Sequence, residues 1–160
     1  MGDEQSNFAS EALLASGAFL SAGPPTAALL RALLADDYTF EDRRHGVNFP
    51  DADAESYPDV VLSAWQIGSG RPRFEVLKIL AVRGDRFVAG LVRIDYGDGM
   101  LFESIHILAL DPTLSLMQRE VDFDPQDSDA AIAELDRLHS QSETGGASQH
   151  AAAPWHRSPD

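Results

Sequence analysis

Asp42 and His106 are the two side chains whose types and surroundings best suit acid–base chemistry. Tyr38, Phe40 and Asp42 share one face of a two-residue repeat, which is typical of a β-strand. If this aromatic face is buried, the Asp42 carboxylate points into an apolar interior, a frequent setting for a functional site. His106 lies on a later strand face that also carries Phe102. A carboxylate and an imidazole on facing pocket walls can act as general base and general acid near neutral pH.

Both residues also have a structural interpretation. Asp42 is followed by Arg43 and Arg44, and pairing with an arginine would make it a structural carboxylate. A lone histidine on an apolar strand face is more often a hydrogen-bonded core residue than a catalytic group. The sequence leaves these alternatives open.

Other residues are candidates for the wall or rim of a pocket. Arg44 could meet an acidic substrate at the rim, or it could be part of a solvated strand end. Asp122 near the end of the last strand is a further candidate acid. The aromatic candidates, which we expect in the core or pocket wall, are Tyr38, Phe40, Trp65 and Phe102.

Several chemistries lack their sequence signals. There is no glycine-rich phosphate loop, no nucleophile elbow and no closely spaced set of metal ligands. Cysteine is absent, which excludes disulfides and thiol nucleophiles. We therefore predict neither a metal nor another cofactor.

The charge balance bears on possible partners. Twelve basic residues against 26 acidic ones give a net charge of −14, which argues against nucleic acid and anionic membrane surfaces. No apolar run approaches the roughly 20 residues of a membrane span, and the acidic start lacks the basic segment of a signal peptide. We expect a cytoplasmic protein.

The pattern of apolar residues and turns predicts an α+β domain. We expect helices at residues 6–19, 27–35, 58–67 and 129–139, and strands at 38–42, 73–82, 86–96, 100–110 and 114–123. Glycine-containing turns between the later strands predict an antiparallel meander. A polar loop after the first strand is expected to cover a site. The domain should span residues 1–139, followed by a disordered tail at 140–160.

This order of elements resembles the NTF2-like family, also called SnoaL-like or ketosteroid-isomerase-like. The resemblance covers about residues 7–139 and is carried by two stretches, ALLADDYTFEDRRHG and FEVLKILAVRGDRFVAGLVRIDYGDGMLFESIHILALD. It implies a strongly curved antiparallel, partly mixed sheet that wraps N-terminal helices into a cone, with a ligand pocket in the open mouth. It also implies a dimer formed through the outer face of the sheet.

The resemblance suggests roles for two residues. Asp42, after Phe40 and Glu41, matches the proton-shuttling base of ketosteroid isomerases, and His106 aligns with their protonated aspartate. The tyrosine that those isomerases carry on the first helix would fall near Ala18, where this chain has none, so we do not expect steroid isomerisation.

Two functions remain open at this point. The first is cofactor-independent proton transfer, of the cyclase, isomerase or dehydratase type, on a small apolar or polyketide-like molecule. The second is a non-catalytic ligand-binding or dimerisation module that accompanies a regulatory or biosynthetic protein. Apolar residues on an uncovered sheet face would favour a homodimer through the sheet; the candidates are Leu77, Ile79, Leu91, Ile105 and Ile107.

Overall fold

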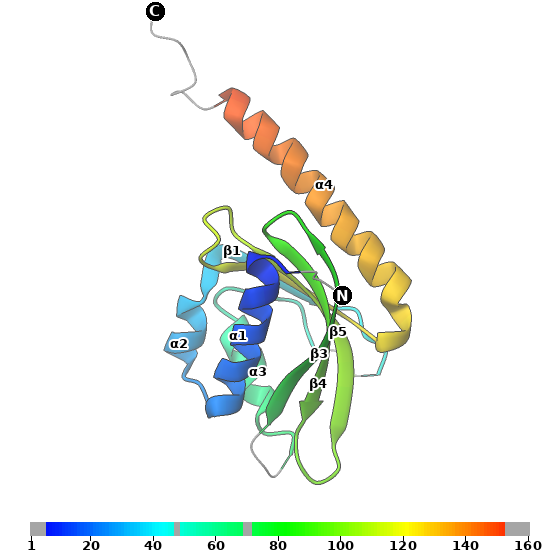
Figure 1. Ribbon diagram of the computed structural model, residues 1–160. Helices are drawn as coiled ribbons and strands as arrows, with labels where there is room; N and C mark the ends of the chain where they lie inside the picture. Colours follow the sequence, from blue (N-terminus) through cyan, green and yellow to red (C-terminus); the bar gives the residue numbers. More distant parts are fainter. Residues whose placement is uncertain (1–5, 47–48, 69–71, 153–160) are drawn as a thin grey trace, which may run out of the picture.

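Helices pack on both sides of one curled, unclosed mixed sheet (Figure 1). The computed structural model describes residues 6–46, 49–68 and 72–152, with side chains up to residue 144. In chain order the elements are α1 (Phe8–Ala22), α2 (Ala27–Ala32), β1 (Leu34–Asp42), β2 (Ala52–Asp53), α3 (Tyr57–Ala64), β3 (Arg73–Arg83), β4 (Phe87–Asp95), β5 (Leu101–Leu110), β6 (Met117–Phe123), the short 3₁₀ helix η1 (Pro125–Asp127) and α4 (Ser128–Ala152).

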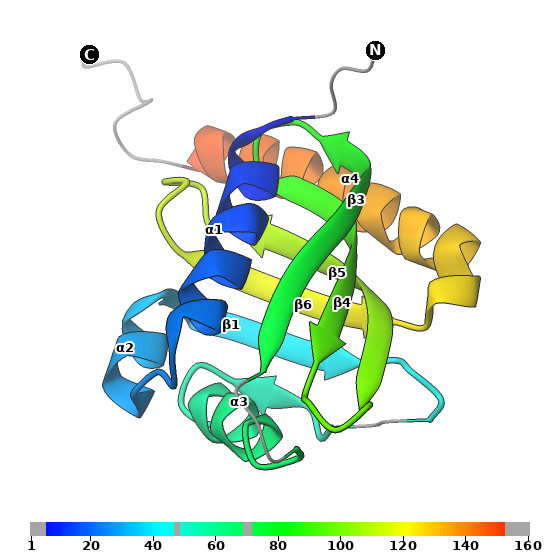
Figure 2. The ribbon, with the colours of Figure 1, turned by 60° about the horizontal axis from the view of Figure 1, so that its bottom comes forward.

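The strands lie in the order β2-β1-β6-β5-β4-β3. Strands β3 to β6 form the predicted antiparallel meander, whereas β1 runs parallel to its neighbour β6. Helices α1, α2 and α3 lie on the concave side of the sheet and α4 lies on the other side (Figure 2). These observations confirm the α+β cone.

The start of α1 is tied to the β3–β4 hairpin. Asn7 caps the helix by accepting a hydrogen bond of 2.7 Å from the backbone N–H of Ser10. The Asn7 amide also donates to the carbonyl oxygens of Gly84 and Phe87, both at 2.9 Å. Further along the helix, Leu13 sits over Gly90 of β4, where an added Cβ would lie only 2.6 Å from Leu13 Cδ2. A larger residue at position 90 would force the Leu13 side chain to move, so glycine favours this close helix–sheet contact.

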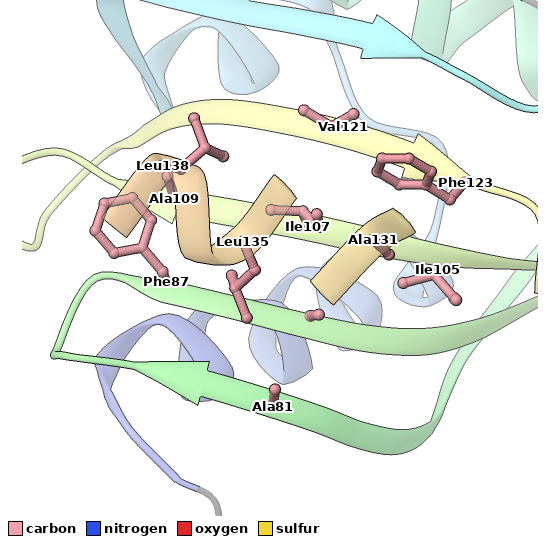
Figure 3. Packing of buried hydrophobic residues seen from close by; sticks show 11 residues of the cluster. Ala81, Phe87, Ile105, Ile107, Ala109, Val121, Phe123, Ala131, Leu135 and Leu138 are labelled. Atoms are coloured by element: carbon pink, nitrogen blue, oxygen red, sulfur yellow. The ribbon is translucent and has the colours of Figure 1, made fainter. Parts of the chain in front are cut away.

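The outer face of the sheet is covered by α4 (Figure 3). Leu135 of α4 is fully buried against this face, and Ile105 and Ile107 beneath the helix are at most 1% exposed. The expectation that these two isoleucines lie on an uncovered face was wrong, because the chain's own last helix buries them. A homodimer through the sheet loses this part of its rationale and stays a prediction.

The structure differs from the sequence prediction at several places, of which three involve strands. Strand β1 begins at Leu34, within the helix predicted for 27–35, because Leu34 pairs with Met117 in the sheet. The predicted loop contains the short strand β2. Strand β6 begins at Met117 rather than at 114, since Leu114 adopts a positive φ of 63° in the preceding turn.

The last helix is longer than its apolar pattern indicated. It continues through 140–152, part of the stretch for which we expected disorder, because extending an existing helix avoids the cost of nucleation. Residues 153–160 lie outside the described part, and the division at residue 139 stays a prediction. Among the described helices, none combines the length and apolar character that crossing a membrane requires.

Candidate functional site

A cavity lies on the concave side of the sheet, next to α1, α2 and α3. Its volume of about 110 Å³ far exceeds the roughly 10–15 Å³ that one water molecule requires, so a small organic molecule can fit. Most of the wall is apolar. Representative apolar lining residues, from the three helices and strands β3 to β5, are Leu13, Leu30, Val61, Val76, Ile94 and Leu108.

The histidine and the two carboxylates that line the cavity come from the neighbouring strands β5 and β6. Asp122 on β6 pairs with His106 on β5 on one side and with Asp42 on β1 on the other. Glu120, two residues before Asp122, faces the same side of the sheet, since side chains alternate along a strand. The sheet thus gathers ionisable groups that are far apart in sequence, and Arg44 just after β1 joins them in lining the cavity.

Asp42 itself does not line the cavity. Its carboxylate is fully buried and accepts hydrogen bonds from Arg44 Nε at 2.8 Å and Arg44 Nη2 at 2.7 Å. Backbone N–H groups of Arg44 and Phe49 donate to the same carboxylate at 3.1 Å and 2.9 Å. Asp42 is therefore a structural carboxylate that orients the Arg44 guanidinium, and both of its oxygens are occupied.

His106, Glu120 and Asp122 form the tightest polar cluster. His106 Nδ1 lies 3.1 Å from Glu120 Oε2 and 3.4 Å from Asp122 Oδ1. The other ring nitrogen, Nε2, lies 2.9 Å from the hydroxyl oxygen of the buried Ser104. The imidazole is thus held on both sides.

Two tyrosines complete the hydrogen bonds of Glu120. The Tyr57 hydroxyl donates to Glu120 Oε1 at 2.9 Å and the Tyr38 hydroxyl to the same oxygen at 3.3 Å. The ring of Tyr57 packs against those of Tyr38 and Phe40, with centroid distances of 4.9 and 5.2 Å. Helix α3 thereby delivers a hydroxyl to a carboxylate on β6.

Comparison with known proteins finds similar folds among solved structures only. No family model matches the sequence, and no curated protein matches it. Solved structures do match: an NTF2-like protein from Anabaena variabilis aligns with a TM-score of 0.57 at 11% identity, over 76% of this chain and 92% of that one. The chain has the NTF2-like fold.

Two further structures support the same fold. PrhC from Penicillium brasilianum aligns with a TM-score of 0.57 at 12% identity, over 82% of this chain and 89% of that one. A putative ketosteroid isomerase from Kribbella flavida aligns with a TM-score of 0.50 at 22% identity, over 71% and 76%. At such identities the likeness concerns the NTF2-like fold alone.

Burial and neighbouring charges shift the pKa values of Asp122, Glu120 and His106 in different directions. Burial, together with the charge of Glu120, raises the pKa of Asp122 well above its ordinary value, although His106 and Arg44 oppose this. Burial acts the same way on Glu120, but hydrogen bonds from His106 and Tyr57 outweigh it and lower the Glu120 pKa. For His106, burial lowers the pKa, and the two carboxylates reverse the effect and raise it. Of the three groups, Asp122 is therefore the carboxyl whose pKa is shifted toward the protonated form.

The sequence candidates divide into two groups. Phe40, Arg44, Trp65, His106 and Asp122 line the cavity. The remaining three lie outside its lining: Asp42 behind Arg44, Tyr38 beside Glu120, and Phe102 in edge-to-face contact with Tyr96.

Glu120 and Tyr57 are among the polar lining residues that the predicted site left out. Glu120 shares the strand face of Asp122 by simple alternation, so its signal was present in the sequence. Tyr57 lies at the start of α3 in a stretch predicted as loop, where no local pattern marks it.

Proposed function

We propose that this protein is a SnoaL-like pocket enzyme that transfers a proton to or from a small, mostly apolar molecule, in chemistry of the cyclase, isomerase or dehydratase type. The proposal rests on one observation. Asp122 lines an apolar cavity with a raised pKa, beside the ion pair of His106 and Glu120 and within the electrostatic influence of Arg44. A carboxyl group that keeps its proton near neutral pH is suited to general acid catalysis.

The polar end of the cavity favours a ligand with an oxygen acceptor. Glu120 already accepts from Tyr57, Tyr38 and His106, so little of its acceptor capacity remains. Arg44 and a protonated Asp122 are donors. A carbonyl, epoxide or hydroxyl oxygen at one end of an apolar molecule would match these groups.

In this scheme Asp122 donates its proton to the ligand oxygen, and the ionised Asp122 then removes a proton from a carbon of the ligand, so the ligand gains one proton and loses one. The Arg44 guanidinium donates a hydrogen bond that polarises the same oxygen before the proton arrives, and Asp42 holds the guanidinium in place. His106 and Glu120 set the protonation of Asp122 through their charges. This scheme assigns the proton transfer to Asp122 rather than to Asp42, the base that the sequence suggested.

One observation favours the alternative of a non-catalytic binding or dimerisation module. Glu120, His106, Ser104 and the two tyrosines satisfy one another's hydrogen bonds without a ligand. Such a network can serve only to stabilise the floor of a binding pocket. A cytoplasmic location and a homodimer also remain predictions.

A ligand panel with two isosteric variants separates these functions. Apolar ketones, epoxides and alcohols are screened by thermal shift, since a ligand at a hundredfold excess over Kd adds about 2.7 kcal/mol of stability. Hits are then assayed for turnover in wild type, Asp122→Asn and the control Asp124→Asn. Asp124 accepts a hydrogen bond from the His45 backbone and lies outside the cavity lining.

The enzyme proposal requires turnover that Asp122→Asn abolishes and Asp124→Asn retains. Ligands that bind wild type and Asp122→Asn equally, with no turnover by wild type, would establish the binding module instead.

A further inference from the structure

We infer that His106 Nδ1, Glu120 Oε2 and Asp122 Oδ1 form a site for one divalent transition-metal cation, of the Zn²⁺ or Mn²⁺ class, at the polar end of the cavity. The site uses residues of the proposed function but is a separate property of them. Cation and proton compete for the same atoms, so the cation-loaded protein cannot use Asp122 as an acid.

The spacing of the three atoms suits a single ion. They all lie within 4.8 Å of one another, and His106 Nδ1 is 3.1 Å from the Glu120 oxygen and 3.4 Å from the Asp122 oxygen. Metal–ligand bonds of about 2.0–2.2 Å at tetrahedral or octahedral angles place ligand atoms roughly 3.0–3.5 Å apart. Both separations from His106 Nδ1 fall in this range, so an ion could bind once the two carboxylate oxygens, which lie within 4.8 Å of each other, close around it.

Two of the three proposed ligands, His106 and Glu120, have their second polar side-chain atom in contact with a hydroxyl group outside the site. His106 Nε2 is within 2.9 Å of Ser104 Oγ; when Nε2–H donates to that oxygen, the lone pair of Nδ1 faces the carboxylates. Glu120 Oε1 accepts from Tyr57, which leaves Oε2 for an ion. Metal-binding histidines and carboxylates typically have such outer hydrogen bonds.

The Asp122 carboxyl group gives a second, independent reason to propose a cation site. Its Oδ1 is buried and has no hydrogen-bond partner within the described part of the chain, and the residue is only 4% exposed. The nearest donor, His106 Nδ1, is closer to Glu120 and cannot serve both carboxylates with one proton. In the ionised form of Asp122 this oxygen is a buried acceptor without a partner, which is costly, and a cation would satisfy it.

The ligand types select the class of cation. One imidazole nitrogen with two carboxylate oxygens suits Zn²⁺, Mn²⁺ or Fe²⁺, whereas Ca²⁺ prefers six to eight oxygens. Three protein ligands leave further coordination positions directed at the cavity, as in open metal sites.

Calorimetric titration of chelator-treated full-length protein with Zn²⁺ and Mn²⁺ tests the site. We expect one ion per chain, affinity at least about tenfold weaker in His106→Ala and Asp122→Asn, and a loss of roughly 10–100-fold in Ser104→Ala, which removes only the outer partner. The matched control is His45→Ala, because His45 belongs to an exposed cluster with Asp124 and Asp127. It should bind as wild type does, and Ca²⁺ should not compete.

Wild-type affinity in both His106→Ala and Ser104→Ala, loss of binding in His45→Ala, or equal binding of Ca²⁺ would each overturn the site. Ser104→Ala keeps all three ligands, so the test holds even if His106→Ala fails to fold. The proposed function predicts turnover in the presence of chelator, so a missing metal site and a missing enzyme activity are distinguishable.

Discussion

Replacing Asp42 with asparagine should destabilise the fold rather than remove a catalytic base. The Asp42 side chain is fully buried, and that of its partner Arg44 is 9% exposed. Breaking a buried ion pair by neutralising one partner costs about 3–5 kcal/mol, because the other charge stays buried. At about 2–4 °C per kcal/mol for a chain of this size, the melting temperature should fall by roughly 6–20 °C.

Urea unfolding followed by circular dichroism measures this loss. The control is Glu103→Gln, which breaks the Arg93–Glu103 pair, whose side chains are 39% and 35% exposed, at an expected cost of about 0–1 kcal/mol. The double variant Asp42→Asn, Arg44→Met should recover part of the lost stability, since it leaves no unpaired buried charge.

The stability that the Asp42–Arg44 pair contributes should decrease at low pH. Burial alone would raise the pKa of Asp42, but the hydrogen bonds from Arg44 and Phe49 lower it below 3.8. The pair's contribution is therefore present above that ordinary value and is lost as pH falls through the lowered pKa. If Asp42→Asn costs no more than Glu103→Gln while ligand binding disappears, Asp42 is a free site carboxylate and the reasoning fails.

Three further changes test other parts of the structure. Gly90→Ala should lower the free energy of unfolding in urea by about 1–3 kcal/mol, because the added Cβ would lie 2.6 Å from Leu13 Cδ2 of α1. The control Gly23→Ala should be near neutral, because an added Cβ there has nothing within 4 Å. Equal losses in the two variants would contradict the close contact. Leu135→Ala, on the side of α4 that faces the sheet, should cost about 2–5 kcal/mol, and Leu14→Ala, 52% exposed, less than about 0.5 kcal/mol; a small Leu135 effect would mean that α4 does not cover the sheet. Because the raised pKa of Asp122 makes wild-type stability fall as pH rises above 3.8, Asp122→Asn should gain stability relative to wild type as the pH rises above that value, and a constant difference would refute the raised pKa.

Local patterns predicted most of the elements and their faces. Alternation placed Tyr38, Phe40 and Asp42 on one buried strand face, as the structure confirms. The turns at Gly84 and Gly97 predicted the hairpins that join β3 to β4 and β4 to β5. Both signals depend only on neighbours in sequence, which is why they could be interpreted without the fold.

For the last helix, the sequence predicted the apolar face but not the surface against which it packs. Its apolar face, with Leu135 and Leu138, was visible in the sequence. The sheet face that would receive it was not, because burial of Ile105 and Ile107 depends on which side of the sheet the chain crosses after η1. The expectation of an uncovered sheet face failed for this reason.

The sequence by itself determined the fold type, the order of the elements and the side of the sheet to which the ionisable residues point. Only the tertiary structure decided their partners. Pairing of β1 with β6 in parallel, and of β6 with β5, sets Asp42, Asp122 and His106 side by side. A two-residue repeat specifies a face but not the register between distant strands, and register decides that Asp122 lies beside His106 in the cavity, where burial raises the Asp122 pKa.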